Sequence, residues 1–169
     1  MAETIYLLLG SNLGDRSRHL ATARDDLSRI DGLDITAISP VYQSEEVEMD
    51  EDAPLFLNQV VKGDYQYTPS ELLAEIEEIE RVHGRSAKGQ LLPRTIDIDI
   101  LMFGERVIKT PDLTVPHKKL LNRPFAIVPL LAIDPDAVHP ETKKPLADSL
   151  KKKAAGQAVL FEDHVSRNV

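Results

Sequence analysis

A short segment in which aspartate and isoleucine alternate places the strongest constraint on how this chain can fold. It begins after Pro93, contains Thr95, Asp97 and Asp99 with isoleucine at the even positions between 96 and 100, and ends at Gly104. Alternation with a period of two predicts a β-strand whose two faces differ. We expect the isoleucines to face a core and the two aspartates to emerge together on the other face, about 7 Å apart at the backbone.

Two interpretations of this aspartate pair are open from the sequence. Neighbouring carboxylates repel each other, and a shared cation removes that repulsion. Mg²⁺ suits such a pair because it prefers hard oxygen ligands and combines one or two carboxylates with water and substrate phosphates. Arg94, next to the alternating segment, could contact a phosphate with its two-pronged guanidinium group. The alternative is an ordinary edge strand whose polar residues face solvent.

Composition limits the class of protein. The chain has 169 residues, of which 42% are hydrophobic and 28% charged, so we expect one soluble globular domain over residues 1–169. A net charge of -8 disfavours a general nucleic-acid binder, and the absence of cysteine excludes disulfides and zinc–thiolate sites. The N-terminus shows no basic segment followed by a long apolar run, and no stretch approaches membrane-spanning length. We expect a cytoplasmic protein with neither a membrane nor a nucleic-acid partner.

The first part of the chain predicts a strand, a helix and a second strand. Residues 4–9 are apolar and predict a buried strand. The glycine-containing segment 10–15 follows, and it is either a phosphate-binding loop or a plain strand-to-helix turn. Apolar residues recur at helical spacing over 16–30. Residues 33–44 predict another strand, with an edge or bulge at Pro40.

A third strand is expected after the acidic segment 45–54, which itself predicts a loop. The pattern over 55–67 places Phe56 and Asn58 on one face of this strand. An aromatic ring beside an amide suits a flat heterocycle, because the ring offers a face and the amide both donates and accepts hydrogen bonds. A half-buried phenylalanine beside a turn-side asparagine fits the same pattern.

A capping box marks the start of the second helix. Thr68, Pro69 and Glu71 stand at its N-cap, first and third positions, and Gly84 ends it. The polar loop over 84–92 carries cations and could close over a nucleotide as a lid. The residues expected on the buried face of the helix are Leu72, Leu73, Ile76, Ile79 and Val82.

The last part of the chain is less regular. After the central strand we expect a turn at Gly104 and a short returning strand at 107–108. His117 follows a proline in a loop and is either structural or catalytic. The apolar segment 125–133 predicts a buried helix that Pro129 either interrupts or occupies in its first turn.

Five motifs occur in an order that is hard to obtain by chance. They are Gly10-Ser11-Asn12-Leu13, then Asn58, then Pro93-Arg94-Thr95-Ile96-Asp97-Ile98-Asp99-Ile100, then Leu113-Thr114-Val115-Pro116-His117, and then Asn122-Arg123-Pro124-Phe125. With these motifs the chain resembles the 6-hydroxymethyl-7,8-dihydropterin pyrophosphokinase family of folate biosynthesis. The resemblance covers residues from 5 to about 138.

The resemblance implies both a fold and a reaction. The fold would be an α+β, ferredoxin-like sandwich with a mostly antiparallel sheet flanked by helices. The enzyme would transfer the β,γ-pyrophosphoryl group of ATP to the hydroxymethyl oxygen of 6-hydroxymethyl-7,8-dihydropterin and release AMP, with two Mg²⁺ ions as cofactors. Such a transfer needs alignment and charge neutralisation more than covalent participation by the protein.

The resemblance also implies roles for individual residues. The catalytic residues would be Arg85, Arg94, Asp97 and Asp99, and the two aspartates would hold the metal ions. The pterin site would contain Ser44, Val47, Phe56, Asn58 and Phe125, with the two phenylalanines against opposite faces of the ring. The nucleotide site would contain Glu80, Arg94, Ile100, Thr114, His117 and Arg123.

The chain departs from the family in the loop before the P-R-T sequence. The family often carries a tryptophan and a further arginine there, whereas this chain has Gln90, Leu91 and Leu92 and no tryptophan at all. The loop is also one residue shorter than the family pattern. These departures concern lid closure and nucleotide affinity more than the metal or pterin sites.

Three other functions are alternatives. The chain could be a different Mg²⁺-dependent phosphotransferase or nucleotide hydrolase, a non-catalytic nucleotide- or pterin-binding module, or an acidic structural domain. The combination of Arg94, Asp97, Asp99 and His117 favours catalysis. We expect a monomer, because no surplus apolar helix face suggests a partner.

Overall fold

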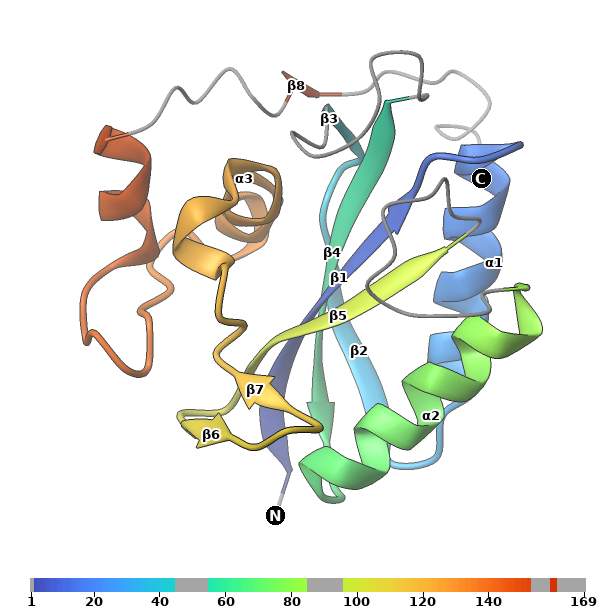
Figure 1. The fold of residues 1–169 in the computed structure, drawn as a ribbon, viewed down its shortest axis with the longest axis horizontal. Helices are drawn as coiled ribbons and strands as arrows, with labels where there is room; N and C mark the ends of the chain where they lie inside the picture. The colour runs from blue at the N-terminus through green and yellow to red at the C-terminus, as the bar shows by residue number, and fades with distance from the viewer. Residues whose placement is uncertain (1, 45–54, 85–95, 153–158, 161–169) are drawn as a thin grey trace.

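An antiparallel sheet runs through the middle of the molecule, with helices on both faces (Figure 1). The computed structural model describes residues 2–44, 55–84, 96–152 and 159–160. Helices α1 (Arg16–Ser28) and α2 (Pro69–Val82) cover one face, and α3 (Pro124–Ile133) covers the other. The strands are β1 (Glu3–Ser11), β2 (Leu33–Ile38), β3 (Tyr42–Ser44), β4 (Phe56–Tyr65), β5 (Asp97–Phe103), β6 (Ile108–Lys109), β7 (Thr114–Val115) and β8 (Val159–Leu160).

The strand order confirms the expected fold class. It is β5-β1-β4-β3-β8, with β2 also paired to β4, while β6 and β7 form a separate two-stranded sheet. Every pairing between the described strands is antiparallel. The succession β1, α1, β2, β4, α2 and β5, with β1 and β4 at the centre, is the ferredoxin-like arrangement.

Alternate residues of the central strand β1 enter two separate hydrophobic cores. Ile5, Leu7 and Leu9 pack beneath α1 and α2, whereas Tyr6 and Leu8 pack beneath α3. The strand is buried from Ile5 to its end because it has a helical layer on each side. This two-sided burial explains why its sequence is a continuous apolar run rather than an alternating one.

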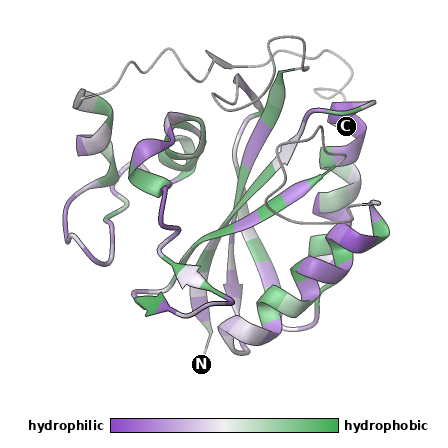
Figure 2. Ribbon diagram, in the orientation of Figure 1, coloured by the Kyte–Doolittle hydropathy of each residue, from purple (hydrophilic) through white to green (hydrophobic). Residues whose placement is uncertain are grey.

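Both helices on the first face begin at side-chain caps. The Asp15 carboxylate accepts a hydrogen bond from the N–H of Arg18 at 3.3 Å. The Thr68 hydroxyl accepts one from the N–H of Glu71 at 3.2 Å, and this contact confirms the capping box. Hydrophilic and hydrophobic residues alternate around α2, as expected for an amphipathic helix (Figure 2).

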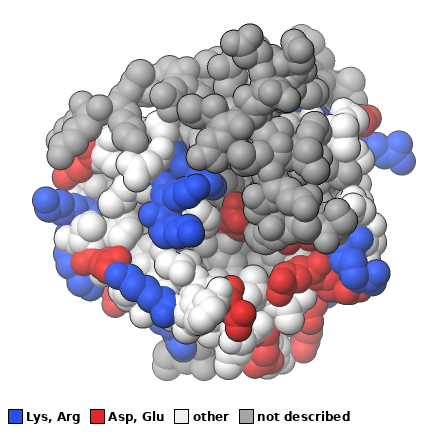
Figure 3. Space-filling model, in the orientation of Figure 1, with Lys and Arg blue, Asp and Glu red and all other residues white. Residues whose placement is uncertain are grey.

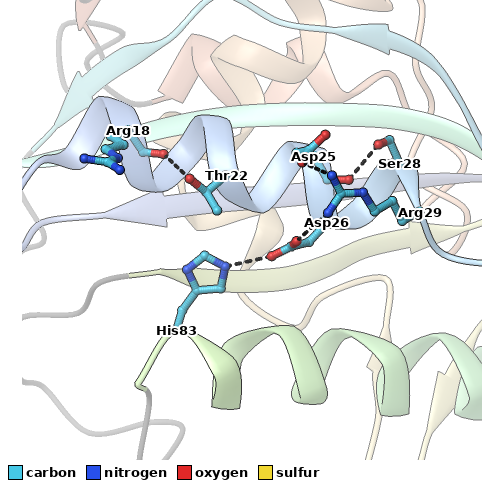
Figure 4. A network of polar contacts seen from close by, with 7 residues as sticks. All are labelled: Arg18, Thr22, Asp25, Asp26, Ser28, Arg29 and His83. Carbon is cyan, nitrogen blue, oxygen red and sulfur yellow. Dashed lines mark hydrogen bonds and ion pairs between the residues drawn. The ribbon is translucent and has the colours of Figure 1, made fainter.

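The buried face of α2 ends differently from the sequence expectation. Leu72 and Ile76 are buried as expected, but Val82 is 66% exposed. The inward stripe passes instead through His83, whose side chain is 9% exposed. Its Nε2 lies 2.9 Å from the Asp26 carboxylate of α1, and Figure 4 shows the imidazole reaching across to that helix. This contact joins α1 to the end of α2, directly before the residues that lie outside the described structure.

Three expected strands differ in extent or partner. Residues 33–44 form β2 and β3 rather than one strand, because Pro40 has no N–H to offer the ladder. β1 continues beyond Leu9, since Gly10 and Ser11 still pair with β4. The returning strand after the turn at Gly104 pairs with β7 and not with β5.

Pro129 neither interrupts α3 nor lies in its first turn. It stands inside the helix, which begins with Pro124 at its first position. Proline lacks an N–H, so the Phe125 carbonyl receives no helical hydrogen bond from it. The apolar side chains of Ala126 and Leu130 are fully buried, and this packing offsets the lost hydrogen bond. None of the helices in the described part of the chain has the length and apolarity to cross a bilayer.

Candidate active site

The register of the sheet gathers the predicted site residues on the face that α3 covers. Asp97 on β5 lies opposite Gly10 on β1, Gly10 lies opposite Asn58 on β4, and Asn58 lies opposite Tyr42 on β3. Residues directly opposite in antiparallel strands share a face. The four positions therefore form a row across the sheet, although up to 87 positions separate them in the sequence.

The two aspartates emerge as the alternation predicted. Ile96, Ile98 and Ile100 belong to the core beneath α1 and α2, which leaves Asp97 and Asp99 half-buried on the opposite face. That face is the side of α3, and not open solvent.

A cation stands next to this carboxylate pair. The guanidinium of Arg123, the residue before α3, lies 4.0 Å from the carboxylate of Asp99, and both side chains are largely shielded from water. Figure 3 shows lysine and arginine side chains gathered beside acidic side chains near the middle of the view. The structure thus brings together a residue expected to hold metal and a residue expected to contact the nucleotide.

Glu80 is buried behind the aspartate pair. Its side chain is 3% exposed, and its Oε2 accepts a hydrogen bond from the N–H of Ile98 at 2.9 Å. Ile98 lies between the two aspartates, so this contact joins α2 to the part of β5 that carries them. The described contact of Glu80 is within the protein, and its expected role toward the nucleotide stays a prediction.

An amide and a hydroxyl meet at the other end of the row. The side-chain amide nitrogen of Asn58 donates to the Ser44 hydroxyl at 2.5 Å, with both residues buried. This hydrogen bond fixes the amide plane, and the carbonyl oxygen of Asn58 then faces Gly10. A Cβ added at Gly10 would lie 3.4 Å from that oxygen and 3.4 Å from the Phe56 ring. The absent side chain at Gly10 keeps open the space between them, a role that the pattern of glycine within a strand could have signalled.

The two predicted aromatic residues differ in burial. Phe56 is 5% exposed, whereas Phe125 in the first turn of α3 is half-buried. The Arg123 guanidinium lies 5.5 Å from the centroid of the Phe125 ring, which is a cation–π distance. Arg123 therefore contacts both the aromatic residue and the carboxylate pair.

Thr114 lies in β7, and His117 lies in the segment after β7, which runs beside β5. The N–H of His117 donates to the Leu101 carbonyl at 2.9 Å, and its Nδ1 accepts from the N–H of Lys119 at 3.2 Å. A neutral imidazole that accepts at Nδ1 carries its proton on Nε2, so Nε2 is a donor. Thr114 is half-buried, and the Ile100 side chain lies in the opposite core, so Ile100 can reach this face only through its backbone.

Three predicted site residues lie outside the described residues: Val47, Arg85 and Arg94. The acidic loop and the loop expected to act as a lid lie there as well, so their roles stay predictions.

The donor set fits magnesium better than a metal held by the protein alone. In the described ranges no group of three or more histidine, cysteine, aspartate or glutamate side chains could hold an ion. Two oxygen-donor carboxylates are what Mg²⁺ uses when substrate phosphates and water complete its octahedron. Asp97 and Asp99 therefore fit a metal that arrives with a phosphate ligand.

Comparison with known proteins identifies what this chain is similar to. Residues 6–135 match the family described as 7,8-dihydro-6-hydroxymethylpterin-pyrophosphokinase (HPPK). The 2-amino-4-hydroxy-6-hydroxymethyldihydropteridine pyrophosphokinase of Aquifex aeolicus is 42% identical over 145 residues, which cover 86% of this chain and 89% of that protein. The folic acid synthesis protein fol1 of Schizosaccharomyces pombe is 40% identical over 147 residues, or 87% of this chain. The chain spans only 20% of the length of fol1.

Solved structures share the fold at lower sequence identity. The Plasmodium falciparum HPPK-DHPS structure with pteroate superposes with a TM-score of 0.69 at 14% identity, covering 90% of this chain and 44% of that one. An HPPK-DHPS crystal structure in complex with substrates gives a TM-score of 0.68 at 13% identity, covering 90% of this chain and 43% of that one. At these identities the likeness shows the fold alone.

Proposed function

Since the chain belongs to the 7,8-dihydro-6-hydroxymethylpterin-pyrophosphokinase family, we propose that it transfers pyrophosphate from ATP to 6-hydroxymethyl-7,8-dihydropterin. The products are AMP and the pterin diphosphate, a step of folate biosynthesis. One observation carries the proposal beyond family membership. The row from Asp97 through Gly10 to Asn58 has a carboxylate pair that suits a metal–phosphate complex at one end, and a buried side-chain amide toward the other.

The pterin side of the reaction depends on orientation. The bond from Asn58 to Ser44 fixes the amide, which then presents donors and an acceptor to the edge of a planar ring. Phe125 and Phe56 offer aromatic surface to its faces, and Gly10 leaves room for it. The proposal requires the hydroxymethyl group of the ring to lie toward the Asp97 end of the row, where the phosphates are expected.

The nucleotide side depends on charge. When bound, two Mg²⁺ ions neutralise the phosphates and lower the pKa of the attacking hydroxyl. Asp97 and Asp99 supply the carboxylates for these ions, while Arg123 contacts negative charge that develops on the transferred group. His117 can donate from Nε2 to a phosphate oxygen. Arg85 and Arg94 are proposed to close the site from the loop between α2 and β5.

A product assay tests the proposal. The protein is mixed with ATP, Mg²⁺ and 6-hydroxymethyl-7,8-dihydropterin, and nucleotides and pterins are separated by chromatography. We expect AMP and the pyrophosphorylated pterin in equal amounts, only when all three components are present. Omission of Mg²⁺ with added chelator should abolish both products.

Other products would identify a different activity. ADP, or AMP formed without pterin, would replace the proposal by a general phosphotransferase or hydrolase. Binding of pterin without any product would leave a binding module. We also propose that the active species is a cytoplasmic monomer. Light scattering that gave twice the mass of 18.8 kDa would overturn the monomer.

A further inference from the structure

A polar cluster holds the end of α3 that lies away from the candidate site. Helix α3 ends at Asp134, whose Oδ2 accepts a short hydrogen bond from the Tyr6 hydroxyl of β1. The ammonium group of Lys62 on β4 lies 3.4 Å from the same oxygen and 5.7 Å from the centroid of the Tyr6 ring. The three residues are far apart in the sequence and come from three different elements.

Tyr6 and Lys62 are neighbours on one face of the sheet. They are directly opposite each other in the pairing of β1 with β4, so their side chains rise together from the same face of the sheet. Burial, the hydrogen bond to Asp134 and the charge of Asp134 all raise the pKa of Tyr6, so its hydroxyl stays protonated and donating throughout the neutral range. Asp134 is thus held by a neutral donor and a cation at once.

The length of α3 connects this cluster to the active site. Ten residues of α3 span about 15 Å. The helix therefore connects two parts of the sheet: Asp134 at its C-terminal end meets Tyr6 and Lys62, and Arg123 at its N-terminal end lies 4.0 Å from the Asp99 carboxylate of β5.

Apolar packing alone does not fix the helix along its axis. Ala126, Ile127 and Leu130 pack on the sheet, and such contacts are non-directional. At this end of α3, Leu131 and Ile133 are only partly buried against the core, and Asp134 lines a hollow of about 530 Å³ together with Asp136, Val138 and Lys143. Among the described residues, the sheet side chains that contact the Asp134 carboxylate are Tyr6 and Lys62.

We propose that Tyr6, Lys62 and Asp134 are positioning residues, which set where α3 lies along the sheet and thereby place Arg123 and Phe125 in the active site. The kinetic part of this proposal rests on the proposed pyrophosphokinase activity. The mechanical part does not, because the position of a helix can be measured without turnover. A shift of about 1 Å at reacting groups can lower the rate about 100-fold, so residues far from the reacting groups can affect catalysis by positioning α3.

The test compares four variants: Asp134→Ala, Asp134→Asn, Tyr6→Phe and Asp136→Ala. Asp134→Ala removes the acceptor, and Tyr6→Phe removes only the donating hydroxyl. Asp134→Asn keeps an oxygen that can accept from Tyr6. Asp136→Ala is the matched control, since it removes an exposed carboxylate that lines the same cavity.

Hydrogen exchange provides the readout that needs no activity. The N–H groups of Ala126 and Ile127 bond to the Arg123 carbonyl at 2.9 Å and 3.1 Å and report on the first turn of α3. We expect Asp134→Ala and Tyr6→Phe to speed their exchange about tenfold while the amides of β1 stay protected. Asp134→Asn should retain most of the protection, and Asp136→Ala should not change it.

Enzyme kinetics and a double variant complete the test. Asp134→Ala should lower kcat/KM for the pterin about 10- to 100-fold. Combined with Phe125→Ala, it should weaken pterin binding little beyond the single Phe125 variant, because the proposed effect of Asp134 on the pterin passes through Phe125. Unchanged exchange at the first turn, or equally faster exchange throughout β1, would overturn the proposal. If the wild-type protein formed no product, only the proposed function would be contradicted. Hydrogen exchange and pterin binding would still test the role of Tyr6, Lys62 and Asp134.

Discussion

The Glu80 carboxylate of α2 accepts a hydrogen bond from the N–H of Ile98, 2.9 Å away, at the start of the edge strand that carries Asp97 and Asp99. An unpaired N–H on a sheet edge needs an acceptor when it is buried. Glu80 supplies that acceptor from a different element, and so it joins the aspartate pair to α2.

Replacement of Glu80 should weaken both the fold and the site. Glu80→Ala leaves the buried N–H of Ile98 without this acceptor, which is expected to lower the free energy of unfolding by about 1–3 kcal/mol. Glu80→Gln keeps an accepting oxygen and should lose less. Urea unfolding measures both variants. The matched control is Glu77→Ala, an exposed position on the same helix, which should change stability by less than about 0.5 kcal/mol. A Glu80→Ala protein as stable as this control would show that the contact is dispensable.

The aspartate pair should be essential for turnover and unimportant for folding. Asp97→Ala or Asp99→Ala is expected to lower kcat by at least about 100-fold, because each removes a carboxylate from the metal–phosphate complex. The free energy of unfolding should change by less than about 1 kcal/mol, since removing one of two neighbouring carboxylates also relieves repulsion. Asp34→Ala, at an exposed position of β2, is the control for loss of a strand carboxylate. Near-normal turnover of either variant at ordinary Mg²⁺ would contradict the metal assignment.

Substitutions of the two phenylalanines should differ in their effects on pterin binding and on the free energy of unfolding. Phe125 is half-buried, so Phe125→Ala should weaken pterin binding about tenfold with a modest effect on folding. Phe56 is 5% exposed, so Phe56→Ala should weaken pterin binding and also lower the free energy of unfolding by about 3–5 kcal/mol. Pterin fluorescence, nucleotide binding and thermal unfolding together distinguish these outcomes. Equal losses of pterin and nucleotide binding would assign Phe56 to the core alone.

Acid should destabilise the protein partly through His139. This residue is 6% exposed, and its Nδ1 accepts from the N–H groups of Glu141 and Thr142, both at 3.2 Å. Burial lowers the pKa of His139 below its ordinary value of 6.5, against a smaller opposing effect of the Glu141 charge. The unfolded chain therefore takes up the proton first as the pH falls below about 6.5. Stability from this residue is fully present above that pH and is lost as the pH falls toward the lowered pKa.

A variant isolates this contribution. His139→Asn keeps a side-chain oxygen near the Nδ1 position but does not titrate. Between about pH 7.5 and about pH 5.5, the melting temperature of the wild-type protein should fall more than that of the variant. Parallel curves would show that protonation of His139 is not linked to unfolding. The His139 side chain is buried because it folds back over its own turn in the segment after α3.

Local chemistry in the sequence determined the elements whose signals are short-range. The capping residues Thr68 and Glu71 set the start of α2, and the alternation around Asp97 and Asp99 assigned the faces of β5 before any partner strand was known. The ordered motifs identified the family, and with it the antiparallel α+β fold, because they fix particular residue types at particular spacings. These features depend on neighbours within a few positions, which is why the sequence alone carries them. That the chain forms one domain to its last residue stays a prediction.

Only the tertiary structure decided what depends on register and on contacts between distant elements. The sequence places Gly10, Asn58 and Asp97 far apart, and the pairing of three strands puts them in one row. The contact of Glu80 with β5 and the contact of His83 with α1 also join elements that are distant in the sequence. Local sequence patterns therefore do not reveal them. No local pattern encodes the hydrogen bond from Tyr6 to Asp134, because its two groups meet only after α3 has packed across the sheet. Periodicity fixes which face a side chain occupies, whereas packing fixes what it meets there.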